Sequence, residues 1–84
     1  MDRLGFIILS ILKRGMASSR TYSMTVREIA SAEDFGVKEN TVFKKLRDFE
    51  KAGYITRGIK DGRAHTFIIT NEGCRALEEE RGKS

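Results

Sequence analysis

The sequence predicts a small α+β domain that is mainly helical, and three observations support this fold class. Eighty-four residues leave room for one hydrophobic core, so we expect a single domain over residues 1–84. Apolar residues recur at helical spacing in several segments, above all in residues 38–52. Two β-type runs flank the pair Asp61-Gly62, and an Asp-Gly pair in this setting is typical of a hairpin.

The first expected helix covers residues 3–14 and ends at Gly15. At only nine residues, its apolar part (4–12) is too short for a membrane span, and it lacks the cleavage site of a signal peptide. Phe6 and Leu9 fall outside the core stripe, and two interpretations remain open. Either a partner surface covers them, or a neighbouring helix of the same chain does. The stripe itself consists of Leu4, Ile7, Ile8, Ile11 and Leu12.

The second helix is expected to begin at Thr25, after a polar connection (17–20) and a short extended piece (22–24). Thr25 and Glu28 have the spacing of a capping box, in which each side chain bonds the other residue's backbone amide. Met24 and Ile29 are placed to form a hydrophobic staple around this start. Ile29 and Ala30 then face the core, and the helix ends near residues 32–34.

A turn and the third helix follow. Phe35-Gly36-Val37 forms the turn, in which Gly36 can take a positive φ. The third helix covers residues 38–52, and Gly53 ends it. Its two faces differ sharply. One is an apolar stripe of Val42, Leu46 and Phe49, and the other is a polar, cationic row of Asn40, Lys44, Arg47 and Lys51.

The last part of the chain is expected to form a hairpin and a fourth helix. The strands are residues 54–59 and 64–70. Thr70 caps a helix from residue 71 to about residue 80, with Cys74 and Leu77 turned inward and a frayed tail after about residue 78. The order helix, strand, helix, turn, helix, hairpin, helix is that of a winged helix-turn-helix.

The composition narrows the classes of function. The net charge is +4, and residues 38–60 carry seven cations and three acids, which favours an anionic partner. Cys74 is the only cysteine and His65 the only histidine, so the sequence predicts no internal disulfide and no Cys/His metal site. We therefore expect no cofactor and a reducing, cytoplasmic location. Since no nucleophile–base pairing or phosphate-binding loop is evident, an enzyme is not expected.

Several of these residues also form a recognisable series. The run EIA…FGVKENTVFKKLRDFEKAGYI, the hairpin and ITNEGCRAL resemble the winged-helix transcriptional regulators of the MarR and PadR families. Two features depart from the family pattern. Four residues (31–34) stand where two are usual, and Lys38 replaces the usual Ser or Thr cap, at a cost of about 1 kcal/mol.

The resemblance implies a sequence-specific DNA-binding regulator that acts as a homodimer. Helix 38–52 is then the recognition helix in the major groove, and the basic wing 57–65 lies on the minor groove or on phosphates. Arg20 and Arg27 are candidates for further backbone contacts. The dimer would form through the Phe6/Leu9 face of the first helix and through the last helix. The candidate DNA-binding residues are Asn40, Thr41, Phe43, Lys44, Arg47, Lys51, Arg57, Lys60 and Arg63.

Two alternatives remain open at this stage. Phe43 lies either against a thymine methyl or in a widened core stripe. The whole domain is either a DNA reader or a winged-helix protein-interaction module. In the second case the basic face is merely solvated, and Phe43, Phe6 and Leu9 are the contact residues.

Overall fold

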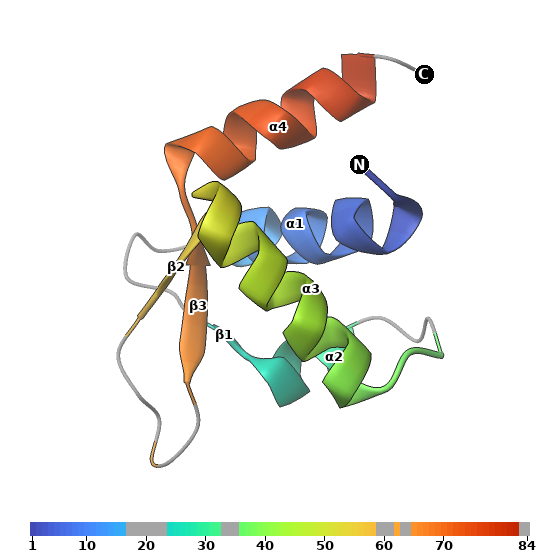
Figure 1. Ribbon diagram of the computed structural model, residues 1–84, viewed down its shortest axis with the longest axis vertical. Helices are drawn as coiled ribbons and strands as arrows, with labels where there is room; N and C mark the ends of the chain where they lie inside the picture. The colour runs from blue at the N-terminus through green and yellow to red at the C-terminus, as the bar shows by residue number, and fades with distance from the viewer. Residues whose placement is uncertain (17–23, 33–35, 59–61, 63–64, 83–84) are drawn as a thin grey trace.

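The computed structural model describes residues 1–16, 24–32, 36–58, 62 and 65–82, and these residues confirm the expected fold class and element order. Figure 1 shows the arrangement of the elements. In chain order they are α1 (Arg3–Met16), β1 (Met24–Thr25), α2 (Val26–Ala32), α3 (Glu39–Ala52), β2 (Ile55–Arg57), β3 (Thr66–Ile69) and α4 (Asn71–Gly82).

Two helices are longer than the sequence predicts. α1 continues through Gly15 to Met16, so this glycine does not end the helix. α4 continues to Gly82, whereas a frayed tail was expected after about residue 78. The expected connection at 17–20, the extended residues 22–23, Phe35 and the wing residues Lys60 and Arg63 lie outside the described residues.

The strands form a small antiparallel sheet with β3 in the centre, in the order β1-β3-β2. Phe67 of β3 is paired on one side with Met24 and on the other with Arg57. Ile55 of β2 lies opposite Ile69 of β3. The strand β2, which follows α3 in the chain, therefore runs directly beside β3. This register brings the strand after α3 and the strand before α4 together.

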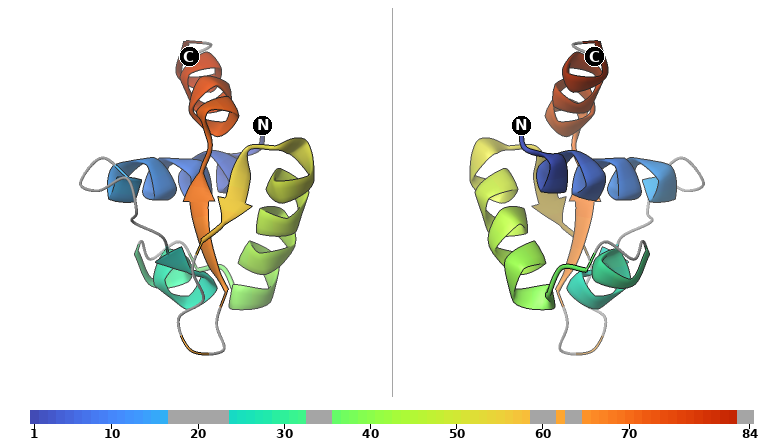
Figure 2. Two further views of the ribbon diagram at one scale, coloured as in Figure 1. Left: turned by 90° about the vertical axis from the view of Figure 1, so that its left-hand side faces the viewer. Right: turned by 90° about the vertical axis from the view of Figure 1, so that its right-hand side faces the viewer.

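The helices pack on the sheet and on one another to form a hydrophobic core. α1 contacts β3, α2 and α4, while α3 contacts α2 and β2. Figure 2 shows α2 below α1, α3 rising on the opposite side from the level of α2 to that of α1, and α4 at the other end of the molecule. Ile8, Ile29 and Leu46 are fully buried where these elements meet. Burial of such side chains is the main stabilising contribution in a domain of this size.

Leu9 is covered by its own chain, which confirms one of the two interpretations left open for it, whereas its expected place in a dimer surface is wrong. Its side chain is 0% exposed and belongs to the core cluster, so it is not available to a partner. Phe6, in contrast, is half-buried and packs against the edge of the core. The reason is tertiary: α1 is contacted by both β3 and α4, so a wider arc of this helix is covered than a single stripe suggests.

Three of the expected local signals are confirmed, at the start of α2, the end of α3 and the start of α4. The Glu28 amide donates to Thr25 Oγ1 at 3.1 Å, and the Thr25 amide donates to Glu28 Oε1 at 2.9 Å, which completes the capping box. Gly53 has φ 82° and ends α3, with its amide bonded to the Glu50 carbonyl oxygen at 3.1 Å. Thr70 Oγ1 accepts from the Gly73 amide at 3.1 Å and so caps α4.

Candidate nucleic-acid interface

α3 has the two faces that its sequence predicts. Val42, Leu46 and Phe49 are buried in the core and fix the back of the helix to the domain. The opposite row is exposed to solvent along the whole helix, and Thr41 beside it is exposed as well. The exposed row consists of Asn40, Lys44, Arg47 and Lys51.

Phe43 lies on the core side of this boundary. Its side chain is half-buried and packs against the core cluster. The structure thus favours the widened core stripe over a contact with a thymine methyl. Of the three residues on which the protein-interaction alternative depended, Leu9 is fully buried, while Phe43 and Phe6 are both half-buried and pack against the core.

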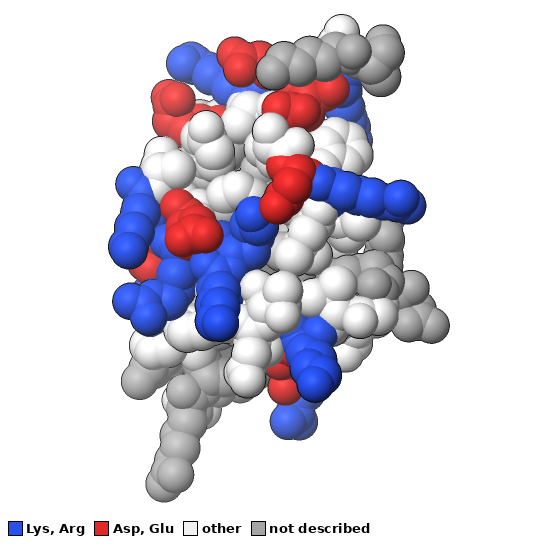
Figure 3. Space-filling model, turned by 45° about the vertical axis from the view of Figure 1, so that its right-hand side comes forward, with Lys and Arg blue, Asp and Glu red and all other residues white. Residues whose placement is uncertain are grey.

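The cations on the exposed face take no part in the ion pairs that the structure describes. Within the described part of the chain, no hydrogen bond or ion pair involves the side chains of Lys38, Lys44, Arg47 or Lys51. Figure 3 shows Lys and Arg side chains gathered on this side of the molecule, with Asp and Glu among them. Exposed cations without an ion-pair partner can bind DNA phosphates, and the counterions condensed on the DNA are then released. No intramolecular ion pair has to be broken for this.

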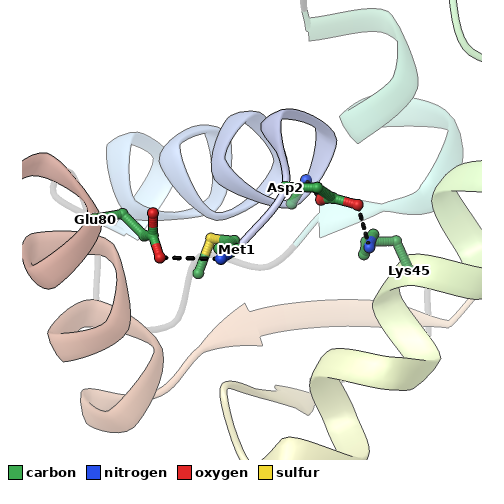
Figure 4. A network of polar contacts seen from close by, with 5 residues as sticks. Met1, Asp2, Lys45 and Glu80 are labelled. Atoms are coloured by element: carbon green, nitrogen blue, oxygen red, sulfur yellow. Dashed lines mark hydrogen bonds and ion pairs between the residues drawn. The ribbon is translucent and has the colours of Figure 1, made fainter. Parts of the chain in front are cut away.

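The neighbouring Lys45 is different, because it is engaged with the start of α1. Its Nζ lies 2.7 Å from Asp2 Oδ2 (Figure 4). The same Nζ is 6.0 Å from the centroid of the Phe49 ring. Asp2 Oδ1 also accepts from the Gly5 amide at 2.8 Å and caps α1. The hydrogen bond from Lys45 is the main reason why the pKa of Asp2 is lowered. Lys45 therefore ties α3 to α1 and is no part of the exposed row.

Each end of α3 carries an ion pair with a neighbouring element. Arg27 of α2 lies 3.4 Å from Glu39, and both side chains are largely exposed. Arg57 of β2 donates to Glu50 from Nε at 2.9 Å and from Nη2 at 3.3 Å. Arg57 is therefore paired with a carboxylate in the free protein, while its expected contact with DNA stays a prediction. Glu50 was not among the expected site residues, although the opposite charges on either side of the turn at Gly53 were a signal for such a pair.

Two further expectations concern the ends of the interface. Lys38 has extended backbone angles (φ −72°, ψ 152°) suited to an N-cap but makes no side-chain cap hydrogen bond. Gly62 has φ 63°, which agrees with the expected Asp-Gly turn at the hairpin tip.

Other kinds of site find no support among the described residues. These residues contain no group of three or more His, Cys, Asp or Glu side chains that could hold a metal ion. Among them there is also no helix with the length and apolar character needed to cross a membrane. Cys74 is half-buried and packs against the core cluster, in the manner of a small hydrophobic residue.

Comparison with known proteins places the fold. No protein-family model and no curated protein matches the sequence. Among solved structures, the chain is similar to a PadR family transcription regulator from Clostridium difficile R20291, with 21% identity and a TM-score of 0.77 over 98% of this chain and 86% of that one. It is also similar to Staphylococcus aureus MepR in a complex with DNA, with 21% identity and a TM-score of 0.78.

The match to MepR covers 98% of this chain but only 63% of MepR. A third similar structure is a possible HxlR family transcriptional factor from Thermoplasma volcanium GSS1, with 17% identity and a TM-score of 0.69 over 93% of this chain and 64% of that one. The likeness extends over nearly the whole chain in all three cases. Together with the element order, it shows that this protein has the winged helix-turn-helix fold of these transcription regulators.

Proposed function

We propose that the protein is a sequence-specific regulator that binds double-stranded DNA through the exposed row of α3. One observation carries this proposal. The back of α3 is locked into the core by Val42 and Leu46, while its front presents Asn40 and three cations without intramolecular partners among the described residues. Such a helix fits the major groove as a rigid body, because its orientation is set by the core and not by the ligand.

Each residue of the row has a role that suits its chemistry. Asn40 stands in the first turn of α3, and its amide can make a bidentate contact with adenine. Lys44 and Arg47 reach guanine or phosphate oxygens one and two turns further on, and Arg47 has the planar fork that suits guanine. Thr41 and Lys51 are placed for phosphate contacts. The similar MepR structure contains DNA, which supports a DNA ligand for this fold.

The wing adds a second, weaker contribution in this proposal. Lys60 and Arg63 flank the Asp-Gly turn and would lie on the minor groove or on phosphates, in a cytoplasmic setting where DNA is accessible. Arg57 stands nearer the base of the wing, on β2, and is engaged with Glu50 in the free protein.

We also propose that the protein acts as a homodimer, since a single module of this size covers little DNA. The surface in question lies between α1 and α4, where Phe6, Ile7 and Ser10 line a shallow hollow together with Arg14 and Arg81. Phe6 remains a contact residue in this proposal, whereas Leu9 does not, because it is buried. Sedimentation of wild-type protein and of Phe6→Ser tests it, and a wild-type monomer at all concentrations would exclude it.

The DNA-binding proposal is tested by titrating labelled duplexes with wild-type protein and with the double variant Lys44→Ala/Arg47→Ala over a range of salt concentrations. We expect the variant to bind more weakly and to reduce the slope of log K against log salt by up to about 2, about 1 for each of the two cations that contacts a phosphate. Arg75→Ala on α4 is the matched control, since Arg75 is exposed and is paired with Glu72 away from α3. Equal affinity of the double variant and Arg75→Ala for every duplex would refute the proposal.

A further inference from the structure

Glu50 and Arg57 form a two-point contact at the edge of the proposed DNA-binding face. The guanidinium bonds both carboxylate oxygens, Nε to Oε2 at 2.9 Å and Nη2 to Oε1 at 3.3 Å. Their side chains are 34% and 36% exposed, so the pair is reachable from solvent. Charge-assisted, bidentate contacts of this kind hold an arginine in a defined orientation.

The sheet constrains Arg57 from its other side. Arg57 is directly opposite Phe67 in the pairing of β2 with β3, and its Cζ lies 5.7 Å from the centroid of the Phe67 ring. Phe67 is 0% exposed, so the ring is a fixed part of the core. A guanidinium over an aromatic face gains a further cation–π attraction. This contact favours the present position of Arg57 when its carboxylate partner is removed.

Glu50 also lies close to the exposed row of α3. Its pKa is lowered, chiefly by the hydrogen bond from Arg57, with smaller contributions from the charges of Arg57, Arg47 and His65. Glu50 is therefore ionised at neutral pH and stands one helical turn after Arg47. A fixed negative charge at this position repels a phosphate that approaches Arg47 or Arg57.

We propose that Glu50 is a specificity determinant, which neutralises Arg57 in the free protein and releases it only to a correctly placed DNA phosphate. This inference rests on the proposed function of α3. At a cognate site, base contacts from the front of α3 fix how deeply the helix lies in the major groove. A backbone phosphate can then replace Glu50 as the partner of Arg57. On DNA of arbitrary sequence no base contacts fix the position of α3 in the groove. Glu50 then opposes the purely electrostatic binding that accounts for non-specific affinity.

The first test compares wild-type protein with Glu50→Gln on a random-sequence duplex in a salt titration. The substitution preserves the size of the side chain and removes its charge. We expect binding to tighten by about threefold to tenfold near 0.1 M salt, and the salt slope to steepen by about 1, because one more cation contributes. Glu72→Gln is the matched control, since Glu72 pairs with Arg75 on α4, and it should bind as wild type does.

A second variant identifies the released group. In Glu50→Gln/Arg57→Gln most of the gain in affinity should disappear, because Arg57 is the cation that Glu50 holds; only the smaller part that comes from relieving the repulsion of phosphates near Arg47 should remain. A third measurement uses a duplex selected from a random pool by the wild-type protein. Glu50→Gln should lower the ratio of selected to random affinity by about threefold or more. Thermal melting of each variant confirms that it is folded.

The outcomes separate the two proposals. If wild-type protein binds duplex DNA but Glu50→Gln binds random duplex no more tightly than Glu72→Gln, the role of Glu50 is refuted while the DNA-binding function stands. A gain of undiminished size in the double variant would refute the release of Arg57. If wild-type protein binds no duplex at any salt concentration, both the function and this inference fail.

Discussion

The carbonyl oxygen of Tyr54 lies where a side chain on Gly73 would begin. A Cβ at Gly73 would stand 2.2 Å from that oxygen and 2.7 Å from Ile69 Cγ1. The same oxygen accepts a hydrogen bond from the Thr70 amide at 2.9 Å. The first turn of α4 therefore packs directly on the backbone that leaves α3, and only glycine allows this approach.

We predict that Gly73→Ala lowers the free energy of unfolding by about 3 kcal/mol, because the obstacle is backbone and cannot move aside as a side chain can. Urea denaturation followed by circular dichroism measures it. Gly82→Ala is the control, since a Cβ at Gly82 meets no atom within 4 Å. Unfolding of Gly73→Ala at the same urea concentration as wild type would contradict the close packing.

Lys38→Ser should stabilise the protein by about 0.5–1 kcal/mol. Lys38 already has the backbone angles of an N-cap, and a serine hydroxyl there can accept the backbone amide hydrogen bond that Lys38 cannot accept. Thermal melting of the two proteins provides the comparison, with Lys38→Ala as the variant that removes the charge but adds no cap. If Lys38→Ser and Lys38→Ala have the same melting temperature, the missing cap does not lower the stability of the wild-type protein.

Leu9→Ala should destabilise the protein by about 3 kcal/mol, since the side chain is fully buried and its removal leaves a cavity. Phe6→Ser on the same helix should cost less, because Phe6 is only half-buried. Denaturant unfolding of both variants distinguishes a core residue from a surface residue. If Leu9→Ala changed the free energy of unfolding only slightly, Leu9 would have to lie on the outer face of α1 and not in the core.

Stability is expected to fall in acid because three carboxyl groups have lowered pKa values in the folded protein. Arg57 lowers the pKa of Glu50, Lys45 that of Asp2, and Lys13 that of Glu78, in each case mainly through a hydrogen bond. A lowered folded-state pKa contributes stability above the unfolded-state pKa, and this contribution is lost as pH falls through the folded value. We expect the loss below about pH 4.5, where unfolded carboxyl groups begin to bind protons.

Melting temperatures measured between pH 7 and pH 3 test this dependence. Asp2→Asn and Glu50→Gln should each flatten the curve in the acid range, because each removes one group whose pKa differs between the two states. Glu79→Gln serves as a control, since no contact of its carboxylate with a described residue is seen. An acid profile unchanged by both substitutions would mean that these pairs do not persist in solution.

The adjacent lysines of α3 should separate DNA binding from stability. Lys44→Ala is expected to weaken DNA binding and leave the melting temperature almost unchanged, since Lys44 is exposed and has no intramolecular partner among the described residues. Lys45→Ala should lower the melting temperature and leave DNA affinity almost unchanged, because it breaks the contact with Asp2 at 2.7 Å. Anisotropy titrations and melting curves of both variants make the comparison. Equal loss of DNA affinity in the two would argue against the proposed division of the helix surface.

Much of the fold was determined by the sequence alone, because the signals are local. Thr25 and Glu28 are three residues apart and find each other within one helical turn. Gly53 ends α3 through its own backbone conformation. The repeat of Val42 and Leu46 defines a buried face wherever the helix packs, and so it also defines the exposed row of the candidate site.

Only the tertiary structure decided which residues around that row are free. Leu9 is buried because two elements cover α1, and Lys45 is engaged because α1 begins beside α3. Arg57 is held by Glu50 because the register of the sheet fixes where its side chain begins. Each outcome depends on distances between elements far apart in the chain or across a turn, and residue periodicity within one helix contains no information about them.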